Sequence, residues 1–176
     1  MSIRSLLLVT VLAIAGATAG FLLARLLRAP PTTLADDPGA LQIGDLRPAL
    51  LLPDAEGQPV SLARFDGKPV LLNFWASWCP PCIGEMPVLD AFARTHPEFH
   101  VVGIAVEPAQ AVRDYLAEHP VSYPILVGSE SSPDESRQFG NQRSVLPFTV
   151  LLGADGRIRK RHTGAFNTDD LEDWVR

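Results

Sequence analysis

Buried strands are predicted where apolar residues run on without regular alternation. Three such runs are VLLNFW (70–75), VVGIAV (101–106) and FTVLL (148–152). Runs of this kind are typical of strands that are covered on both faces of a sheet. Two shorter runs, 49–52 and 59–62, flank a turn with Asp and Gly, and this pattern predicts a short hairpin before the first buried strand.

Between these runs, apolar positions return with helical spacing. One predicted helix has an apolar face made of Cys82, Met86, Leu89 and Ala93 and should end near His96-Pro97. A second has a face made of Val112, Tyr115, Leu116 and His119, and Pro120 should stop it.

The last thirty residues predict a closing hairpin and a final helix. Asp155-Gly156 is a turn signal, and residues 157–162 follow it as an antiparallel partner of the third buried strand. Thr168 should cap the last helix, with two aspartates in its first turn where the helix dipole favours anions. The pattern therefore predicts an α/β domain with a mixed central sheet flanked by helices.

Composition agrees with a single globular domain and a short appendage. The chain has 176 residues, of which 47% are hydrophobic and 20% charged, and its net charge is −5. Nothing in this balance favours nucleic acid as a partner. The basic residues within 157–161 are expected on a strand edge or an exposed face. With two cysteines the chain is no disulfide-dense scaffold, so the core must supply most of the stability.

The N-terminus carries an uncharged run of 19 residues, from Leu6 to Ala24, with arginines on both sides. As a helix it would be roughly 28 Å long, which is close to the thickness of a bilayer core. The small residues at 17–19 fit a cleaved signal peptide instead, but apolar residues continue past them. We predict an uncleaved anchor or a signal peptide over 1–27, a Pro-rich linker over 28–44 and the folded domain over 45–176.

The two cysteines, Cys79 and Cys82, are separated by two prolines and directly follow the first buried run. Cys79 is expected where the strand gives way to a helix, and free N–H groups at a helix N-terminus favour a thiolate over a thiol. Cys82 should lie one turn further on and point the same way. Pro81 suits an early helical position, where its missing N–H is not needed.

Several kinds of site can be built from two cysteines. A disulfide across three residues would be a poor structural staple, because closing so short a loop constrains the unfolded chain little. Zinc normally takes four ligands, and the four histidines show no ligand spacing. A two-cysteine copper(I) site is chemically possible, since thiolates are soft ligands. A thiol–disulfide exchange site fits the sequence best.

The stretch GKPVLLNFWASWCPPC, together with the GEMP, LPFTVLL and DGRI segments that follow, resembles the thioredoxin superfamily. In detail, residues 45–176 are similar to the TlpA/ResA group of membrane-tethered, extracytoplasmic thiol–disulfide oxidoreductases. The resemblance implies a thioredoxin-like fold with an N-terminal β-hairpin. It also implies a redox-active dithiol in place of any added cofactor, and no metal.

The resemblance assigns roles to particular residues. Cys79 would be the attacking thiolate and Cys82 the resolving thiol. Glu85 would be an acid that exchanges protons with the cysteines. Substrate would contact exposed Trp78 and the Leu146-Pro147 segment, whose peptide bond is expected to be cis and whose backbone would pair with substrate. Further residues carry structural expectations: Trp75 should be core, and Pro87 should kink its helix.

One position departs from many thioredoxins, which have a buried aspartate in the strand before the cysteines. This chain has Asn73, which cannot ionise, so Glu85 is expected to take over the proton transfer. The resemblance then implies a reductase of protein disulfides, such as those of apocytochrome c or metal-site cysteines. A transmembrane thiol reductase would supply its electrons, and the catalytic domain would face the periplasm or extracytoplasmic side.

Other functions stay open at the level of sequence. The reverse reaction at the same two cysteines would oxidise protein thiols. A tethered copper(I) chaperone could use the same two cysteines, although no Met-rich or His-rich tract supports it. A peroxiredoxin-like peroxidase needs a threonine three residues before the nucleophile, where this chain has Ala76.

Overall fold

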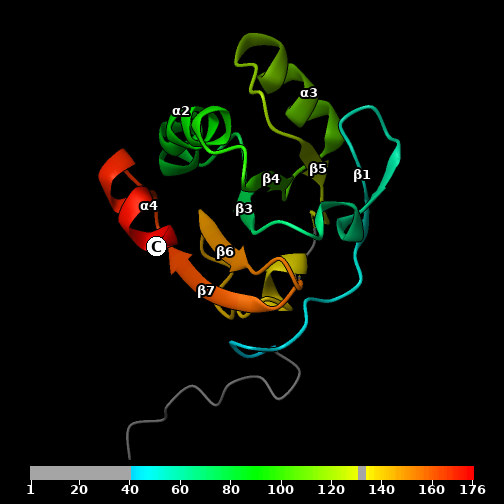
Figure 1. Cartoon of the computed structure of the whole chain (residues 1–176). Coiled ribbons are helices and arrows are strands. Elements are labelled where there is room, and N and C mark those ends of the chain that lie inside the picture. The colour runs from blue at the N-terminus through cyan, green and yellow to red at the C-terminus, as the bar shows by residue number, and fades with distance from the viewer. Residues whose placement is uncertain (1–40, 131–133) are drawn as a thin grey trace, which may run out of the picture. The chain divides into compact units, whose positions relative to one another are not determined.

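The structure is a computed structural model that describes residues 41–130 and 134–176. Its centre is a five-stranded sheet with the order β5-β4-β3-β6-β7 (Figure 1). The strands are β3 (Val70–Trp75), β4 (His100–Ala105), β5 (Ile125–Val127), β6 (Phe148–Leu152) and β7 (Ile158–Thr163). β3 pairs parallel with β4 and antiparallel with β6, so the predicted mixed sheet is confirmed.

Every residue of β3 is buried, as its apolar sequence predicts. Successive side chains of a strand point to opposite faces. Leu71 and Trp75 therefore join one core cluster, whereas Leu72 and Phe74 join the other. Asn73 lies between Leu71 and Trp75 on the first face, in the middle of the sheet, and this placement decides which helix it meets.

That first face packs against three helices. They are α2 (Pro80–Thr95), α3 (Ala109–Glu118) and α4 (Thr168–Val175), and each contributes a buried side chain to the cluster around Leu71 and Trp75. The helix prediction is confirmed, with one correction at the last helix. Its N-cap is Asn167, whose Oδ1 accepts the N–H of Asp170, and Thr168 is the first helical residue. Asn and Thr are both good N-caps, and the chain enters this helix with Asn167 in the cap position.

The opposite face is covered by shorter elements. An antiparallel pair, β1 (Leu51–Pro53) and β2 (Pro59–Ser61), leads into a 3₁₀ helix, η1 (Leu62–Phe65), which buries Leu62 and Phe65 there. A second 3₁₀ helix, η2 (Glu135–Arg137), precedes the buried Phe139. The hydrophobic pattern did not predict η1, η2 or β5, because runs of three or four residues are too short to show a period.

The predicted membrane anchor (1–27) and nearly all of the predicted linker lie outside the described residues. Across 41–130 and 134–176, no helix combines the length and the apolar character that a membrane crossing requires. Residues 41–44, which the sequence assigned to the linker, hydrogen-bond to the domain: Leu41 N–H donates to Gln138 O and Gly44 N–H to Ile158 O.

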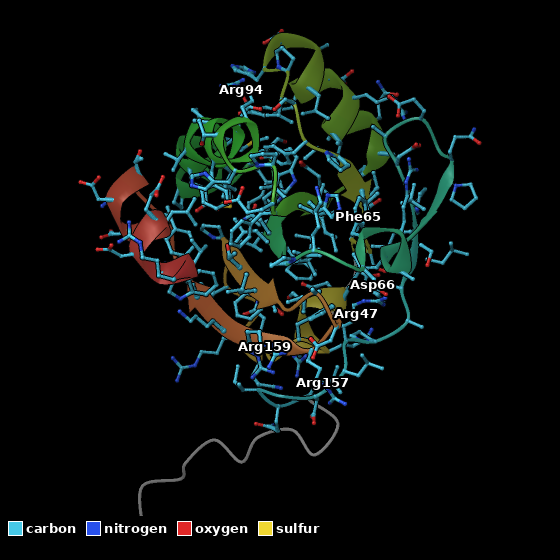
Figure 2. The ribbon with its side chains drawn as sticks, in the orientation of Figure 1. Arg47, Phe65, Asp66, Arg94, Arg157 and Arg159 are labelled. Carbon is cyan, nitrogen blue, oxygen red and sulfur yellow. A yellow bond between two sulfur atoms is a disulfide. The ribbon has the colours of Figure 1, made fainter. Side chains whose placement is uncertain are left out.

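The basic cluster lies on β7 and just before it, at an edge of the sheet (Figure 2). Arg159 forms an ion pair with Asp155 at 2.8 Å, and the Lys160 ammonium donates to the carbonyl of Trp174 at 2.7 Å. At least two of these basic side chains are thus already bound to acceptors of the domain itself.

Candidate active site

The two cysteines form a disulfide at the start of α2. Their sulfurs are 2.07 Å apart and their Cα atoms 5.3 Å apart. Residues 76–78 connect the end of β3 to Cys79, and α2 begins at Pro80. The pair therefore lies where the sequence placed it, between the central strand and the helix that follows.

Cys79 is the N-cap of α2, and its Sγ accepts the backbone N–H of Cys82 at 3.3 Å. The first turn of a helix has N–H groups without helical partners. Pro80 and Pro81 remove two of them, so the first remaining N–H of the helix is that of Cys82, which donates both to the Cys79 carbonyl at 3.0 Å and to the Cys79 sulfur. In the reduced protein this donor and the helix dipole favour the thiolate of Cys79.

The surroundings of the disulfide are asymmetric. Cys82 is fully buried, Cys79 is 4% exposed, and Trp78 next to it is 65% exposed. A partner arriving from solvent therefore meets Trp78 and the Cys79 sulfur before Cys82. Trp75 is buried in the core and packs against Tyr115, as predicted.

Glu85 lies one turn after Cys82 on α2, and only 1% of its surface is exposed. Its Oε1 accepts from the Asn73 amide at 2.7 Å, and its Oε2 accepts from the Phe166 N–H at 3.0 Å. Burial raises the pKa of Glu85 to about 7, and the two hydrogen bonds, which lower it, only partly offset that effect. A carboxyl group with this pKa both accepts and releases protons near neutral pH.

Asn73 links three elements of the fold around Glu85. From the middle of β3 it donates to Glu85 on α2 and, at 3.0 Å, to the hydroxyl of Thr149 on β6. It is fully buried. A neutral amide here serves as a donor to Glu85, where an aspartate would place a second carboxyl group. The sequence showed Asn73 but gave no sign of Thr149 or of the Phe166 N–H.

The Leu146–Pro147 peptide bond is cis, as predicted. The loop before it is held by Asn141, a buried residue that was not predicted from the sequence. Its Oδ1 accepts the N–H of Val145 at 3.0 Å, and its Nδ2 donates to the Val145 carbonyl at 2.9 Å. One side chain thus satisfies both backbone groups of Val145 and fixes the backbone that presents Leu146.

A second carboxylate contacts the cysteine loop. Glu107, two residues beyond β4, is 3% exposed and accepts from Ser77 twice, from the N–H at 2.7 Å and from the hydroxyl at 2.8 Å. Glu107 is not among the residues predicted from the sequence. Its position was a usable signal, because an acid that follows a buried parallel strand lies at the same sheet edge as the end of the neighbouring strand.

For metals the structure offers little besides the two sulfurs. Within 41–130 and 134–176, no three His, Cys, Asp or Glu side chains come together in a way that could hold an ion.

A disulfide at the N-terminus of the helix after a central strand, in a thioredoxin-like sheet and on a chain with a cis-proline, defines the class of thiol–disulfide oxidoreductases. Comparison with known proteins agrees. The redoxin family model matches residues 42–175. The chain is 31% identical over 142 residues to the thiol–disulfide oxidoreductase ResA of Halalkalibacterium halodurans, covering 79% of this chain and 78% of that protein.

Two further relatives agree. Sporulation thiol–disulfide oxidoreductase A of Bacillus subtilis is 29% identical over 148 residues, which cover 78% of this chain and 87% of that protein. The crystal structure of a secreted Mycobacterium tuberculosis disulfide oxidoreductase, homologous to E. coli DsbE, superposes with a TM-score of 0.62 at 25% identity, covering 72% of this chain and 94% of that one. The chain belongs to the redoxin family and is a ResA-like protein thiol–disulfide oxidoreductase.

Proposed function

We propose that the protein reduces disulfides of other proteins on the extracytoplasmic side of a membrane, to which residues 1–27 anchor it. The uncharged run at 6–24 supports the anchor. The secreted relative from M. tuberculosis supports an extracytoplasmic location. The observation that carries the chemistry is the Cys79 sulfur at the N-terminus of α2, with the Cys82 N–H directed at it.

The reaction begins from the dithiol. The Cys79 thiolate attacks one sulfur of a substrate disulfide, a mixed disulfide forms, and the other substrate sulfur leaves as a thiolate. Cys82 then loses its proton and attacks the Cys79 sulfur. The substrate leaves with both of its sulfurs reduced, and the enzyme retains the Cys79–Cys82 disulfide that the structure contains. Two electrons pass from enzyme to substrate.

Glu85 receives the proton of Cys82. It is the buried carboxyl group one turn along the same helix, and its pKa of about 7 lets it take up a proton near neutral pH and release it later. Asn73 and the Phe166 N–H hold its two oxygens in place.

Substrate binds along Trp78, Leu146 and Pro147. Trp78 is an exposed aromatic side chain beside Cys79, suited to an apolar contact with a protein partner. The Leu146 backbone, next to the cis-proline, pairs with the extended substrate segment around its cysteine. Suitable substrates are exposed disulfides in unfolded or flexible segments, such as those of apocytochrome c or those formed by metal-site cysteines. A membrane thiol reductase then returns the enzyme to the dithiol.

A trapping experiment in native membranes tests this function. Cys82→Ser leaves Cys79 without its resolving partner, so mixed disulfides with substrates should accumulate. The double variant Cys79→Ser/Cys82→Ser is the control and should trap nothing. If Cys82→Ser also traps nothing, the proposal fails.

The direction of electron flow needs a separate measurement. Equilibration with a thiol buffer should give a potential near the ~−270 mV of thioredoxin for a reductant, whereas a value near the ~−120 mV of DsbA would identify an oxidant. Stoichiometric retention of copper(I) by the reduced protein, without any trapped partner, would favour the chaperone instead.

A further inference from the structure

Glu107 is a buried carboxylate that the reaction described above does not use. It is 3% exposed, and no described residue forms an ion pair with it. Its two hydrogen bonds come from the N–H and the hydroxyl of one residue, Ser77. Both oxygens accept, which is the pattern of an ionised carboxylate. Burying a charge without a cation is costly, so its place beside the cysteine loop calls for a function.

Ser77 belongs to the loop that carries Cys79. The end of β3 and this loop are attached to the segment that follows β4 at two points: the Val106 N–H donates to the Trp75 carbonyl at 2.9 Å, and Ser77 donates to Glu107. Further along, the Cys79 N–H donates back to the Ala76 carbonyl at 3.1 Å. The position of the Cys79 sulfur at the start of α2 therefore depends on where Glu107 holds Ser77.

The carboxylate is also close enough to Cys79 to act through its charge. Cys79 is two positions after Ser77, so their Cα atoms are at most about 7 Å apart. A carboxylate that bonds Ser77 thus lies on the order of 10 Å from the sulfur. Across a buried protein region, an anion at this distance raises the pKa of a thiol by about one unit.

We propose that Glu107 is a positioning residue for Cys79 whose negative charge opposes the stabilisation of the thiolate by the N-terminus of α2. The helix lowers the pKa of Cys79 and Glu107 limits that lowering. Because a stabilised thiolate favours the dithiol and makes a disulfide a stronger oxidant, Glu107 keeps the pair reducing. This consequence rests on the proposed reductase function, whereas the effect on Cys79 itself does not.

The test uses Glu107→Gln in the full-length, reduced protein. The amide keeps the shape and an acceptor for Ser77 but removes the charge. The pKa of Cys79 is read from the pH dependence of its alkylation by iodoacetamide, and it should fall by about one unit. The dithiol should be favoured about tenfold in a thiol buffer, equivalent to about 30 mV toward oxidising potential.

A purely structural role would give the opposite sign. If Glu107 only held the loop, loosening it would move the sulfur away from the helix N-terminus and raise the pKa of Cys79. An unchanged or raised pKa in Glu107→Gln therefore overturns the proposal. Ser77→Ala provides a second variant: it keeps the carboxylate and removes one donor that balances it, so the pKa of Cys79 should stay or rise, and a fall would also overturn the proposal.

The chain offers a matched control in Asp90. It is another buried carboxylate that accepts from the N–H and the hydroxyl of one serine, Ser122, both at 2.6 Å, but it also pairs with Arg94 and lies eleven residues beyond Cys79 on α2. Asp90→Asn should leave the pKa of Cys79 unchanged. An equal fall in this variant would show that the effect is not specific to Glu107. Alkylation requires no protein substrate, so a failed trapping experiment with Cys82→Ser would not decide this test.

Discussion

Two carboxyl groups on one helix, Glu85 and Asp90, have opposite electrostatic environments. Both are buried, at 1% and 8% exposure. Burial raises the pKa of Glu85 to about 7, and hydrogen bonds from Phe166 and Asn73 fall short of offsetting it. Burial raises the pKa of Asp90 as well, but two hydrogen bonds from Ser122 and the nearby Arg94 guanidinium outweigh it, and the pKa of Asp90 is lowered.

Burial alone raises the pKa of a carboxyl group, and the neighbouring donors and cations determine whether the net shift is upward or downward. Asp90 is paired with Arg94 and accepts two hydrogen bonds from Ser122, so its ionised form is stabilised. The bonds to Ser122 also attach α2 to the segment before β5. Glu85 has two neutral donors and, among the described residues, no cation. The half of α2 that bears the cysteines thus carries an acid that exchanges protons, and the other half carries one that does not.

The largest expected effect is on the pH dependence of stability. With its pKa raised from 4.5 to about 7, Glu85 binds a proton more tightly in the folded than in the unfolded chain. Its contribution is fully present below pH 4.5 and is lost as pH rises through 7, by about 3 kcal/mol in the free energy of unfolding. Glu85→Gln should lack this loss. Urea unfolding of the oxidised protein from pH 4 to 8 measures the difference, and parallel curves would contradict the proposed environment of Glu85.

The rate of disulfide reduction should also depend on Glu85, with a slightly smaller free-energy effect than on stability. Glu85→Gln should lower the rate of disulfide reduction about 100-fold, the usual scale for loss of a general base. In the unaltered protein the rate should rise with pH through about 7, because the ionised carboxylate accepts the Cys82 proton. Single-turnover reduction of a disulfide-bonded protein across this range is the measurement. A step near pH 7 that persists in the variant would assign the proton transfer elsewhere.

Asp90→Asn should show the opposite division between stability and activity. Weakening the bonds to Ser122 and Arg94 should lower the free energy of unfolding at pH 7 by about 2 kcal/mol, while disulfide reduction stays within about twofold. Urea unfolding and the single-turnover assay together test this. A large loss of activity in a folded Asp90→Asn protein would remove the functional distinction between the two halves of α2.

The smallest expected effect is a shift in the pKa of Glu85 when its hydrogen-bond donor Asn73 is replaced. Asn73→Ala removes the donor to Oε1, so the pKa of Glu85 should rise by about one further unit, and the midpoint of the pH–rate profile with it. Asn73→Asp, which adds a second carboxyl group, should move the midpoint at least as far. A midpoint unchanged in both variants would mean that Asn73 does not influence Glu85.

The parts of this site that the sequence predicts are those encoded locally. The apolar run 70–75, the cysteine spacing and the prolines after Cys79 were enough to place the disulfide at the start of a helix. The resemblance to a known family added Glu85 and the cis bond before Pro147. Each of these depends on neighbours within a few residues or on a motif.

The rest depends on contacts between distant segments. Glu107 meets Ser77 only because β3 and β4 are adjacent and parallel. Thr149 reaches Asn73 only because β6 pairs with β3 on the other side. The cap at Asn167 was misplaced by one residue, since both Asn and Thr are good N-caps and the choice depends on the path of the chain leaving β7. The position of Glu107 directly after a buried strand is a local sign of its contact with Ser77, whereas the contact between Thr149 and Asn73 has no signature within either stretch of sequence.

The N–H of Phe166 carries one more consequence. Phe166 stacks on His162 and packs against Trp174, so the tail of the chain decides where this donor points. Phe166 and Trp174, more than eighty positions after the cysteines, therefore help to set the environment of Glu85 at the redox centre. Truncating the chain before Trp174 should therefore disturb proton exchange at Glu85 even though both sulfurs stay where they are.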